Sequence, residues 1–446
     1  MEKLFKLSER GTTVSREIIG GITTFLAMAY ILAVNPGILS ESGMAWGSVF
    51  TATAVSAAVA TLVMAFLANL PVALAPGLGL NAFFTYTVVI GMGCTWQLAL
   101  TAVLLEGILF IVLSVCGVRE AIIRSIPESL KKAVAVGIGL FITIIGLVNA
   151  GIVATDTGTP IGFVNFTMAN KAAIVAVIGL IITIVLYTLN VPGAILIGII
   201  VTTVVGIPFG VTAVPNDWKP FSVPSAPHFF AFDFKGIAVD PASGAFSMAV
   251  LGKFLVIFIT FLFTDLFDTI GTLLGVAEQG NLKTESGEVQ NAKGALLADA
   301  VGTVCGACLG TSTVTSFVES SSGVAAGART GLASVVTAVL FLLSLFLSPL
   351  FFLIPSAATA PALIFVGYLM MKSVVDIKFS DPTEGIPAFI TIMVMPFSYS
   401  ISKGITWGII SYVIAKCAGR KVKDIPVVTW VLAAIFLADI IFEALK

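Results

Sequence analysis

Apolar runs long enough to cross a membrane recur along the whole chain, and they constrain its fold more than any other feature. A helix needs about 20 mostly apolar residues to cross the hydrocarbon. Hydrophobic residues make up 58% of the 446 positions and charged residues only 11%, whereas a soluble domain carries about 25% charged residues. Strand-period alternation is absent, so we expect an all-α polytopic membrane protein.

We expect fourteen transmembrane spans, divided into seven and seven by one polar interval at residues 211–246. Basic residues gather before span one and after spans four, eight, ten, twelve and fourteen, which places the N-terminus and the end of span fourteen in the cytoplasm. The expected spans are residues 16–36, 46–69, 72–92, 95–117, 128–150, 170–190, 192–210, 248–277, 290–310, 312–327, 330–353, 356–374, 384–398 and 401–418.

One more apolar segment follows at residues 425–445. Asp439 and Glu443 lie one turn apart in it, which favours an interfacial helix over a fifteenth span. We expect the chain to lie in a bacterial inner membrane, surrounded by the lipid bilayer.

The two halves of the chain resemble each other. Residues 22–26 (ITTFL) recur as 258–262 (FITFL), and an Ile-Pro pair opens the fifth span at 126–127 and the twelfth at 354–355. Because seven is an odd number, a duplicated unit enters the membrane the opposite way up. We therefore expect two inverted seven-span repeats, an arrangement typical of alternating-access carriers.

Ionisable side chains inside spans are costly and mark functional sites by default. Asp265 and Asp268 are three residues apart, so on a helix they share a face. Two carboxyl groups this close in a poorly hydrated site cannot easily both be ionised, which makes the pair a candidate proton carrier. The alternative is a polar packing pair. Glu106, Asp299 and Glu319 complete the set, and we expect the first two to support neighbouring broken spans.

The third and tenth spans are expected to be broken. Residues 71–84 contain Pro76 and two glycines before Asn81, a natural N-cap. Residues 311–323 begin with a hydroxyl-rich stretch that favours extended chain, after which Ser316 could cap a half-helix. Two half-helix N-termini at membrane depth would offer N–H groups to a polar solute. A pure capping role for Asn81 remains an alternative.

The chain lacks the residues that other classes of protein need. The Cys305-x-x-Cys308 pair lies in a stripe of glycines at every fourth residue of 302–310, which is typical of helix packing. His228 is the single histidine and is expected to be solvated. We therefore expect no metal site, no cofactor and no enzymatic centre, and the net charge of −1 argues against nucleic acid as a partner.

At these residues the sequence resembles the azaguanine-type purine permeases, a branch of the nucleobase–cation symporters. The resemblance covers nearly the whole chain. It implies proton-coupled uptake of adenine, guanine or hypoxanthine, and a homodimer, while the preferred purine and the choice between proton and sodium coupling stay open. Four segments carry it in order, at residues 23–36, 76–84, 264–272 and 315–323.

The resemblance also implies a core domain of spans 1–4 and 8–11 and a gate domain of spans 5–7 and 12–14. The expected parts are 1–125 and 247–353 for the core, 126–210 and 354–420 for the gate, 211–246 for a periplasmic connecting loop, and 421–446 for the C-terminal apolar segment.

Purine binding is implied at four positions by the same resemblance. A carboxylate can accept two adjacent N–H groups from a purine edge, and a phenylalanine could stack on the ring. The implied purine-binding residues are Asn81, Asp265, Asp268 and Glu319, with Phe25, Phe83 and Phe317 as stacking candidates. Proton coupling is expected at Asp265, Asp268 and Glu319, and support from Glu106, Asp299, Ser316 and Ser320.

The main alternative is a carrier of the same architecture for an anion or another small solute. Such a carrier favours a basic residue at the half-helix ends, whereas this chain has acids there. A passive channel needs a continuous polar stripe, but residues 170–210 are almost wholly apolar.

Overall fold

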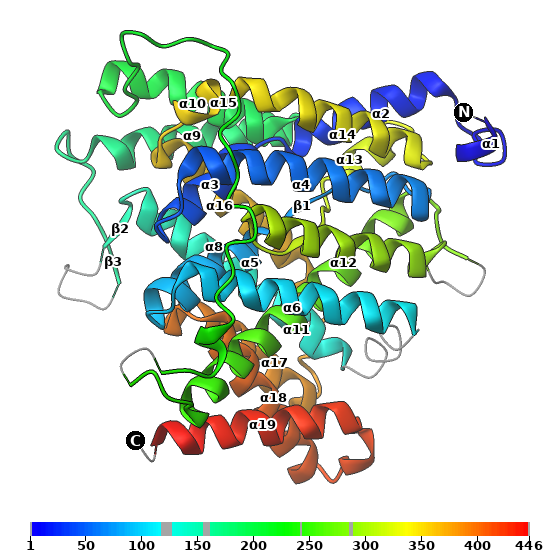
Figure 1. Ribbon diagram of the computed structural model, residues 1–446, viewed down its shortest axis with the longest axis vertical. Helices are drawn as coiled ribbons and strands as arrows, with labels where there is room; N and C mark the ends of the chain where they lie inside the picture. The colour runs from blue at the N-terminus through cyan, green and yellow to red at the C-terminus, as the bar shows by residue number, and fades with distance from the viewer. Residues whose placement is uncertain (1, 117–126, 155–160, 241–242, 285–288, 445–446) are drawn as a thin grey trace.

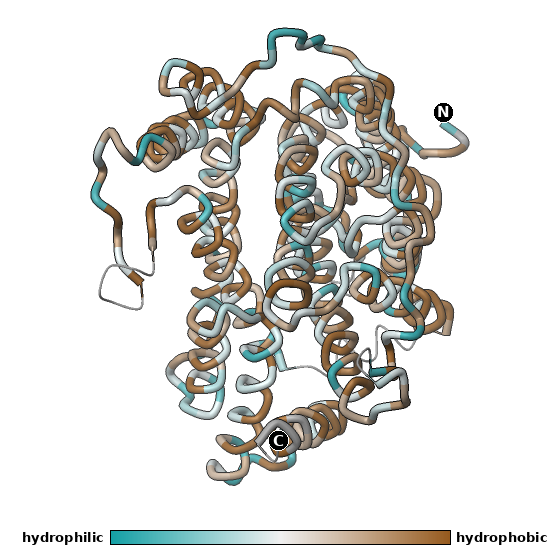
Figure 2. Tube along the Cα trace, turned by 60° about the vertical axis from the view of Figure 1, so that its left-hand side comes forward, coloured by the Kyte–Doolittle hydropathy of each residue, from teal (hydrophilic) through white to brown (hydrophobic). Residues whose placement is uncertain are grey.

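Helices that run side by side make up most of the computed structural model, which describes residues 2–116, 127–154, 161–240, 243–284 and 289–444 (Figure 1). Within these residues, nine helical segments are long and apolar enough to cross a membrane, and three shorter apolar helices accompany them. Hydrophobic residues dominate the helices, and hydrophilic ones gather mainly in the connections (Figure 2). The chain is therefore a helical, multi-pass membrane protein.

In the described residues of the first half, helices are joined by connections that include three short strands. Its elements are α1 (Glu2–Phe5), α2 (Val14–Met28), α3 (Ile31–Ser40), α4 (Trp46–Leu67), β1 (Leu74–Pro76), α5 (Leu78–Ala82), the π-helix η1 (Phe83–Gly91), α6 (Trp96–Val115), α8 (Glu128–Asn149), β2 (Val153–Ala154), β3 (Gly162–Phe163), α9 (Lys171–Thr188) and α10 (Ala194–Phe209).

Where the structure describes the second half, it contains one strand, and short 3-10 turns link some of its helices. Its elements are η2 (Lys235–Ile237), α11 (Met248–Gln279), α12 (Ala292–Leu309), β4 (Val314–Ser316), α13 (Ser320–Ala325), α14 (Gly331–Ser344), η3 (Leu345–Leu347), α15 (Ser348–Phe352), α16 (Ser356–Met371), η4 (Lys372–Asp376), α17 (Pro382–Ser398), α18 (Ile401–Ala418), η5 (Val422–Asp424) and α19 (Val427–Ala444).

The helices pack into two groups, and each group combines helices from both halves of the chain. In the first, which we name the α12 bundle, α12 packs on α4 and α6, α14 packs on α2 and α4, and α11 packs on α6. In the second, the α8 bundle, α8 packs on α16 and α17, α9 packs on α10 and α16, and α17 packs on α18. The boundary expected between residues 125 and 126 lies outside the described residues.

Small residues let α12 approach its neighbours closely. A Cβ added at Gly302 would lie 2.6 Å from Ala60 Cβ of α4, and one added at Gly306 would lie 2.8 Å from Val314 Cγ2 of β4. Neither distance is sterically possible unless the neighbouring atoms shift. The packing role predicted for this glycine stripe is therefore confirmed.

The connection between α10 and α11 lies against the ends of several spans, and His228, which the sequence predicts to be solvated, is half-buried there. The Ala45 N–H donates to His228 Nε2 over 3.3 Å, and the His228 ring lies 5.1 Å from the Trp96 ring. Gly310 ends α12 with a φ of 86°, and a Cβ there would lie 2.7 Å from His228 Cβ. The histidine is held by close packing of the connection on α12.

The C-terminal helix α19 runs alongside the other long helices. It packs against α18 of the α8 bundle and α11 of the α12 bundle, and in Figure 1 it lies parallel to α6. Its Phe436 is fully buried, while Val431 and Ile441 are more than half exposed. An exposed apolar face of this kind suits contact with lipid.

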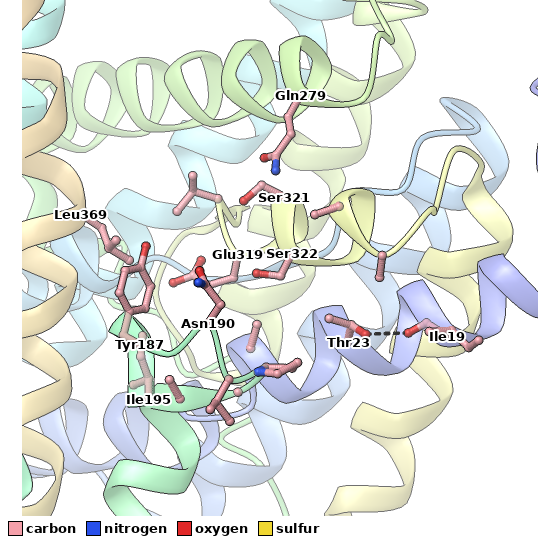
Figure 3. Close-up of a pocket in the computed structure, with 18 of the residues that line it drawn as sticks. Ile19, Thr23, Tyr187, Asn190, Ile195, Gln279, Glu319, Ser321, Ser322 and Leu369 are labelled. Atoms are coloured by element: carbon pink, nitrogen blue, oxygen red, sulfur yellow. Dashed lines mark hydrogen bonds between the residues drawn. The ribbon is translucent and has the colours of Figure 1, made fainter. Parts of the chain in front are cut away.

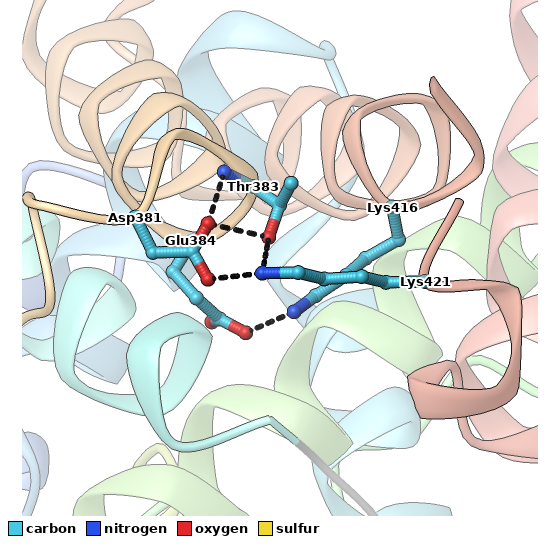
Figure 4. Close-up of polar contacts among 5 residues, drawn as sticks. All are labelled: Asp381, Thr383, Glu384, Lys416 and Lys421. Carbon is cyan, nitrogen blue, oxygen red and sulfur yellow. Dashed lines mark hydrogen bonds and ion pairs between the residues drawn. The ribbon is translucent and has the colours of Figure 1, made fainter. Parts of the chain in front are cut away.

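Two ion pairs join the start of α17 to the end of α18 (Figure 4). Lys416 Nζ lies 2.5 Å from Glu384 Oε1, with only 4% of the lysine side chain and 16% of the glutamate side chain exposed. Lys421 Nζ lies 2.6 Å from Asp381 Oδ2, at a more exposed position. The hydrogen bond from Lys421, with those from the Thr383 hydroxyl and amide, holds the pKa of Asp381 well below its usual value.

Candidate functional site

The two broken spans meet at a small antiparallel sheet inside the α12 bundle. Strand β1 pairs with β4, so that Leu74 lies opposite Ser316 and Pro76 opposite Val314. Two further hydrogen bonds extend the pairing: the Gly77 N–H donates to Thr313 O, and the Phe317 N–H donates to Ala73 O, each over 3.0 Å. The pairing satisfies backbone groups that would otherwise be unpaired in a membrane interior.

The half-helix after β1 holds Asn81, but not as its N-cap. Helix α5 begins at Leu78 and its N-cap is Gly77, so the predicted capping role of Asn81 is wrong: the strand ends at Pro76 and the helix starts directly after it. The Asn81 side chain is fully buried. Its amide N–H donates to Pro76 O over 3.4 Å, and its oxygen accepts from the Ser312 hydroxyl.

The half-helix after β4 corrects the prediction for Ser316 in the same way. Ser316 lies within β4, where its hydroxyl donates to Thr269 O over 3.4 Å. Helix α13 begins at Ser320, with Glu319 as its N-cap residue. The Ser320 hydroxyl accepts from the Ala73 N–H over 3.0 Å, which ties α13 to the chain just before β1.

Glu319 stands at the edge of a cavity of about 740 Å³, which we name the Glu319 cavity. One wall comes from α2 and α13 of the α12 bundle, and the other from α16 and the α9–α10 connection of the α8 bundle. In Figure 3 the side chains of Glu319 and Asn190 both extend into the space between α13 and that connection. The volume falls within the range of about 300–1,000 Å³ that is usual for ligand pockets.

A tyrosine fixes the Glu319 carboxyl group. The Tyr30 hydroxyl donates to Glu319 Oε1 over 2.6 Å, and both side chains are buried, with 1% of Tyr30 and 8% of Glu319 exposed. Hydrogen bonds to a carboxylate are short and stronger than neutral ones. One carboxyl oxygen is thereby held, and Glu319 retains accepting capacity toward the cavity.

The acidic residues of α11 lie next to the paired strands β1 and β4. The Thr269 hydroxyl is 2.7 Å from Asp299 Oδ1, 2.8 Å from the Thr315 hydroxyl and 3.2 Å from Asp265 Oδ1. Asp268 lies beside the start of α5, because a Cβ at Gly77 would be 3.5 Å from Asp268 Oδ2. These contacts bring the α11 carboxyl groups together with both broken spans.

Glu106 on α6 approaches the segment that leads into β4. Its Oε2 accepts from the Thr313 hydroxyl over 2.9 Å, and the whole side chain is buried. Asn35 of α3 makes a similar link, because its amide donates to the Thr311 hydroxyl over 2.9 Å and to the Thr53 hydroxyl over 2.7 Å.

The three phenylalanines proposed to stack on a purine pack against other parts of the protein. Phe83 is fully buried and meets Phe261 edge to face, with ring centroids 4.8 Å apart. Phe25 meets Phe341 in the same manner at 5.2 Å, and Phe317 is buried. None of the three belongs to the described lining of the Glu319 cavity, so stacking stays a prediction for them.

Several polar residues of the site were missed by the sequence reasoning. They are Tyr30, Asn35, Thr269, Ser312 and Thr313, each of which hydrogen-bonds a predicted site residue or a broken span. The available signal was a neutral polar side chain within an apolar span. That signal is weak, because a hydroxyl can also bond to the backbone of its own helix.

Comparison with known proteins defines the class. The permease family matches residues 15–407, and the chain belongs to this family: it is a membrane transporter and not an enzyme. It is 44% identical to the guanine/hypoxanthine permease PbuG of Bacillus subtilis (strain 168), over 99% of this chain and 100% of that protein. It is 41% identical to the adenine permease AdeP of Escherichia coli (strain K12), over 99% and 96% respectively.

A solved structure shares the fold. The transmembrane domain of a cyanobacterium bicarbonate transporter, BicA, matches with a TM-score of 0.65 and 15% sequence identity, over 88% of this chain and 97% of that one. At this identity the likeness concerns the arrangement of the helices alone.

Proposed function

We propose that the protein is a secondary active transporter that takes up purine nucleobases, namely adenine, guanine or hypoxanthine, across the inner membrane. The observation that carries the proposal is Glu319, a buried carboxyl group that is held by Tyr30 at the wall of a cavity between the two bundles. Relatives named as adenine and guanine/hypoxanthine permeases, at 41% and 44% identity over the full chain, support purines as the substrate class.

The chemistry of the site agrees with a purine. The edges of a purine ring carry adjacent N–H groups, and a carboxylate accepts such groups in pairs. Asn81, Asp265 and Asp268 are assigned to the same binding site, with Asp268 beside the start of α5. An anion carrier remains the alternative, but the acid at the Glu319 cavity opposes an anionic substrate.

The proposed transport mechanism is alternating access, in which the binding site opens to one side of the membrane at a time. The α12 bundle is taken as the core domain and the α8 bundle as the gate domain, with fourteen spans in two inverted repeats and the N-terminus in the cytoplasm. A homodimer in the membrane is part of the proposal. The packing of α19 along α18 and α11 supports a fifteenth crossing over the interfacial helix that the sequence favoured.

Protons are proposed as the coupling ion, carried by Asp265, Asp268 and Glu319. The hydrogen bonds around Thr269 support this, because its hydroxyl lies within 3.2 Å of both Asp265 Oδ1 and Asp299 Oδ1. A buried place that holds two carboxyl groups near one hydroxyl is suited to taking up a proton.

Uptake of radiolabelled adenine, guanine and hypoxanthine into cells that lack their own purine uptake tests the proposal. We expect accumulation of at least one purine, driven by an inward proton gradient and abolished by a protonophore. Purine uptake that requires sodium and resists a protonophore would contradict proton coupling. The absence of uptake for all three purines in cells that display the protein would contradict the substrate class.

A further inference from the structure

A second cavity lies at the opposite end of α11 from the Glu319 cavity. Gln279, the last residue of α11, lines the Glu319 cavity, whereas Met248, its first residue, lines the second cavity. The second cavity has a volume of about 660 Å³ and includes Lys253, and we name it the Lys253 cavity.

The two cavities occupy corresponding places in the two repeats. Each has one wall from the first long helix of a repeat together with a broken span, and another from the connection between two helices of the α8 bundle. Lining residues that show this are Ile19 and Leu255 on α2 and α11, Glu319 and Thr87 in the segments of the two broken spans, and Asn190 and Tyr399 on the α9–α10 and α17–α18 connections.

A polar cluster joins the two bundles beside the Lys253 cavity; Tyr86 is buried in it, Asn149 is half-buried and Glu41 is exposed. The Tyr86 hydroxyl of η1 donates to Glu41 Oε1 over 3.0 Å. The Asn149 amide, at the end of α8, donates to the Tyr86 hydroxyl over 2.9 Å and approaches Glu41 Oε1 at 3.4 Å. Glu41 ends α3, which packs on α4, and Tyr86 lies in η1, which packs on α6, whereas Asn149 ends α8. The cluster therefore joins the α12 bundle to the α8 bundle.

Tyr399 packs against the same place. Its ring centroid lies 6.2 Å from that of Tyr86 and 5.5 Å from that of Phe141 on α8, edge to face in both cases. The backbone of Tyr399 is left-handed, with a φ of 53°. A bulky residue adopts this conformation rarely, and only where its surroundings hold it.

We propose that Tyr86, Glu41 and Asn149 form a latch that holds the two bundles together at the Lys253 cavity while the Glu319 cavity is accessible from the other side. The inference rests on the alternating access of the proposed function. When the protein opens toward the Lys253 side, the bond between Asn149 and Tyr86 breaks and Tyr399 leaves the Tyr86 ring. The latch therefore favours the conformation in which the Lys253 side is closed, and its loss shifts the populations of the two conformations of the carrier.

Cysteine labelling tests the latch without any substrate. One reporter is the Val256→Cys variant, because Val256 lines the Lys253 cavity and is 7% exposed. The other is the Ser322→Cys variant in the Glu319 cavity. Each is made in a background without the five native cysteines, purified, and treated with a charged maleimide. Adding Tyr86→Phe should raise the labelling rate at position 256 by about two- to ten-fold, the effect of one lost hydrogen bond, and lower the rate at position 322.

Asn149→Ala should also raise the labelling rate at position 256 and lower it at position 322. If Tyr86→Phe does not fold, Asn149→Ala tests the latch in its place. Tyr368→Phe is the matched control, because Tyr368 is a tyrosine of α16 that is 53% exposed, and it should change neither rate. If a folded Tyr86→Phe or Asn149→Ala variant labels at both positions as the parent does, the latch is wrong. Since no purine is present, failure of purine uptake would leave this result intact.

Discussion

The Tyr30 hydroxyl donates a 2.6 Å hydrogen bond to Glu319 Oε1 across 289 residues of sequence. Tyr30 lies between α2 and α3, and Glu319 is the N-cap residue of α13. The bond connects the helix pair α2–α3 to the half-helix that follows β4. It also fixes the one proposed purine-binding residue that lines the Glu319 cavity.

Removing this hydroxyl should weaken purine binding. In a Tyr30→Phe variant, the Glu319 carboxyl group loses a fixed donor, and a hydrogen bond to a charged group contributes about 1.5–3 kcal/mol. We expect the dissociation constant for purine to rise roughly ten-fold or more, as measured by calorimetry on purified protein. Tyr412→Phe in α18 removes a hydroxyl outside the described lining of the cavity and should leave the constant unchanged. Equal affinities in the Tyr30→Phe variant and the parent would show that Tyr30 does not position Glu319 for binding.

Replacing Glu319 itself should have a direct effect. Glu319→Gln keeps the shape of the side chain but turns one acceptor into a donor, which leaves a purine N–H group without a partner. An unpaired buried polar group costs about 1–3 kcal/mol, so purine affinity should fall roughly ten-fold or more in the same calorimetric measurement. Glu128→Gln, at a side chain that is 74% exposed, is the matched control. Unaltered purine affinity in Glu319→Gln would make Glu319 a structural residue.

The two ion pairs of Figure 4 should differ in their contribution to stability. Lys416→Met leaves the Glu384 carboxylate without its partner in a largely buried place, where breaking a pair costs about 3–5 kcal/mol. Lys421→Met disrupts a more exposed pair, whose contribution is expected to be smaller because solvent screens exposed ion pairs. The melting temperature in detergent should therefore fall further for Lys416→Met. A smaller fall than for Lys421→Met would contradict this account.

The lowered pKa of Asp381 predicts the direction of a pH dependence. The unfolded chain has an Asp pKa of about 3.9, so the stabilisation from the ionised Asp381 is fully present above that value and is lost as pH falls through the lower folded pKa. The difference in melting temperature between the parent and Asp381→Asn should be constant from about pH 8 to pH 5 and should shrink below about pH 4. A difference that already shrinks between pH 7 and pH 5 would contradict the lowered pKa.

Local sequence signals predicted the broken spans, but not where their helices begin. Proline, glycine and clustered hydroxyl residues deny a regular helix through backbone effects that are local. The starts of α5 and α13 depend instead on the pairing of β1 with β4, which joins residues 240 positions apart, such as Ala75 and Thr315. Strands β1 and β4 end at Pro76 and Ser316, and α5 and α13 begin shortly after them at Leu78 and Ser320, so neither Asn81 nor Ser316 is the N-cap that the sequence predicted.

Contacts between distant spans could not be derived from one sequence. An acid within a span stands out because its burial is costly, and Glu319 was found in this way. Its partner Tyr30 and the bundle-crossing Asn149 carry no comparable signal, since buried tyrosine and asparagine are ordinary when hydrogen-bonded. Periodicity and charge thus predict which segments span the membrane, while the hydrogen bonds between spans follow only from the fold.

Protection of a cysteine in the Glu319 cavity by purine tests the central claim most directly. Ser322 lines this cavity and Val256 lines the Lys253 cavity, so the Ser322→Cys and Val256→Cys variants report on the two sites separately. With purine binding first verified for each variant, a saturating purine should slow maleimide labelling of Ser322→Cys strongly and should not shield Val256→Cys. If the Ser322→Cys variant binds purine and is labelled at the same rate with and without it, the Glu319 cavity is not the purine site.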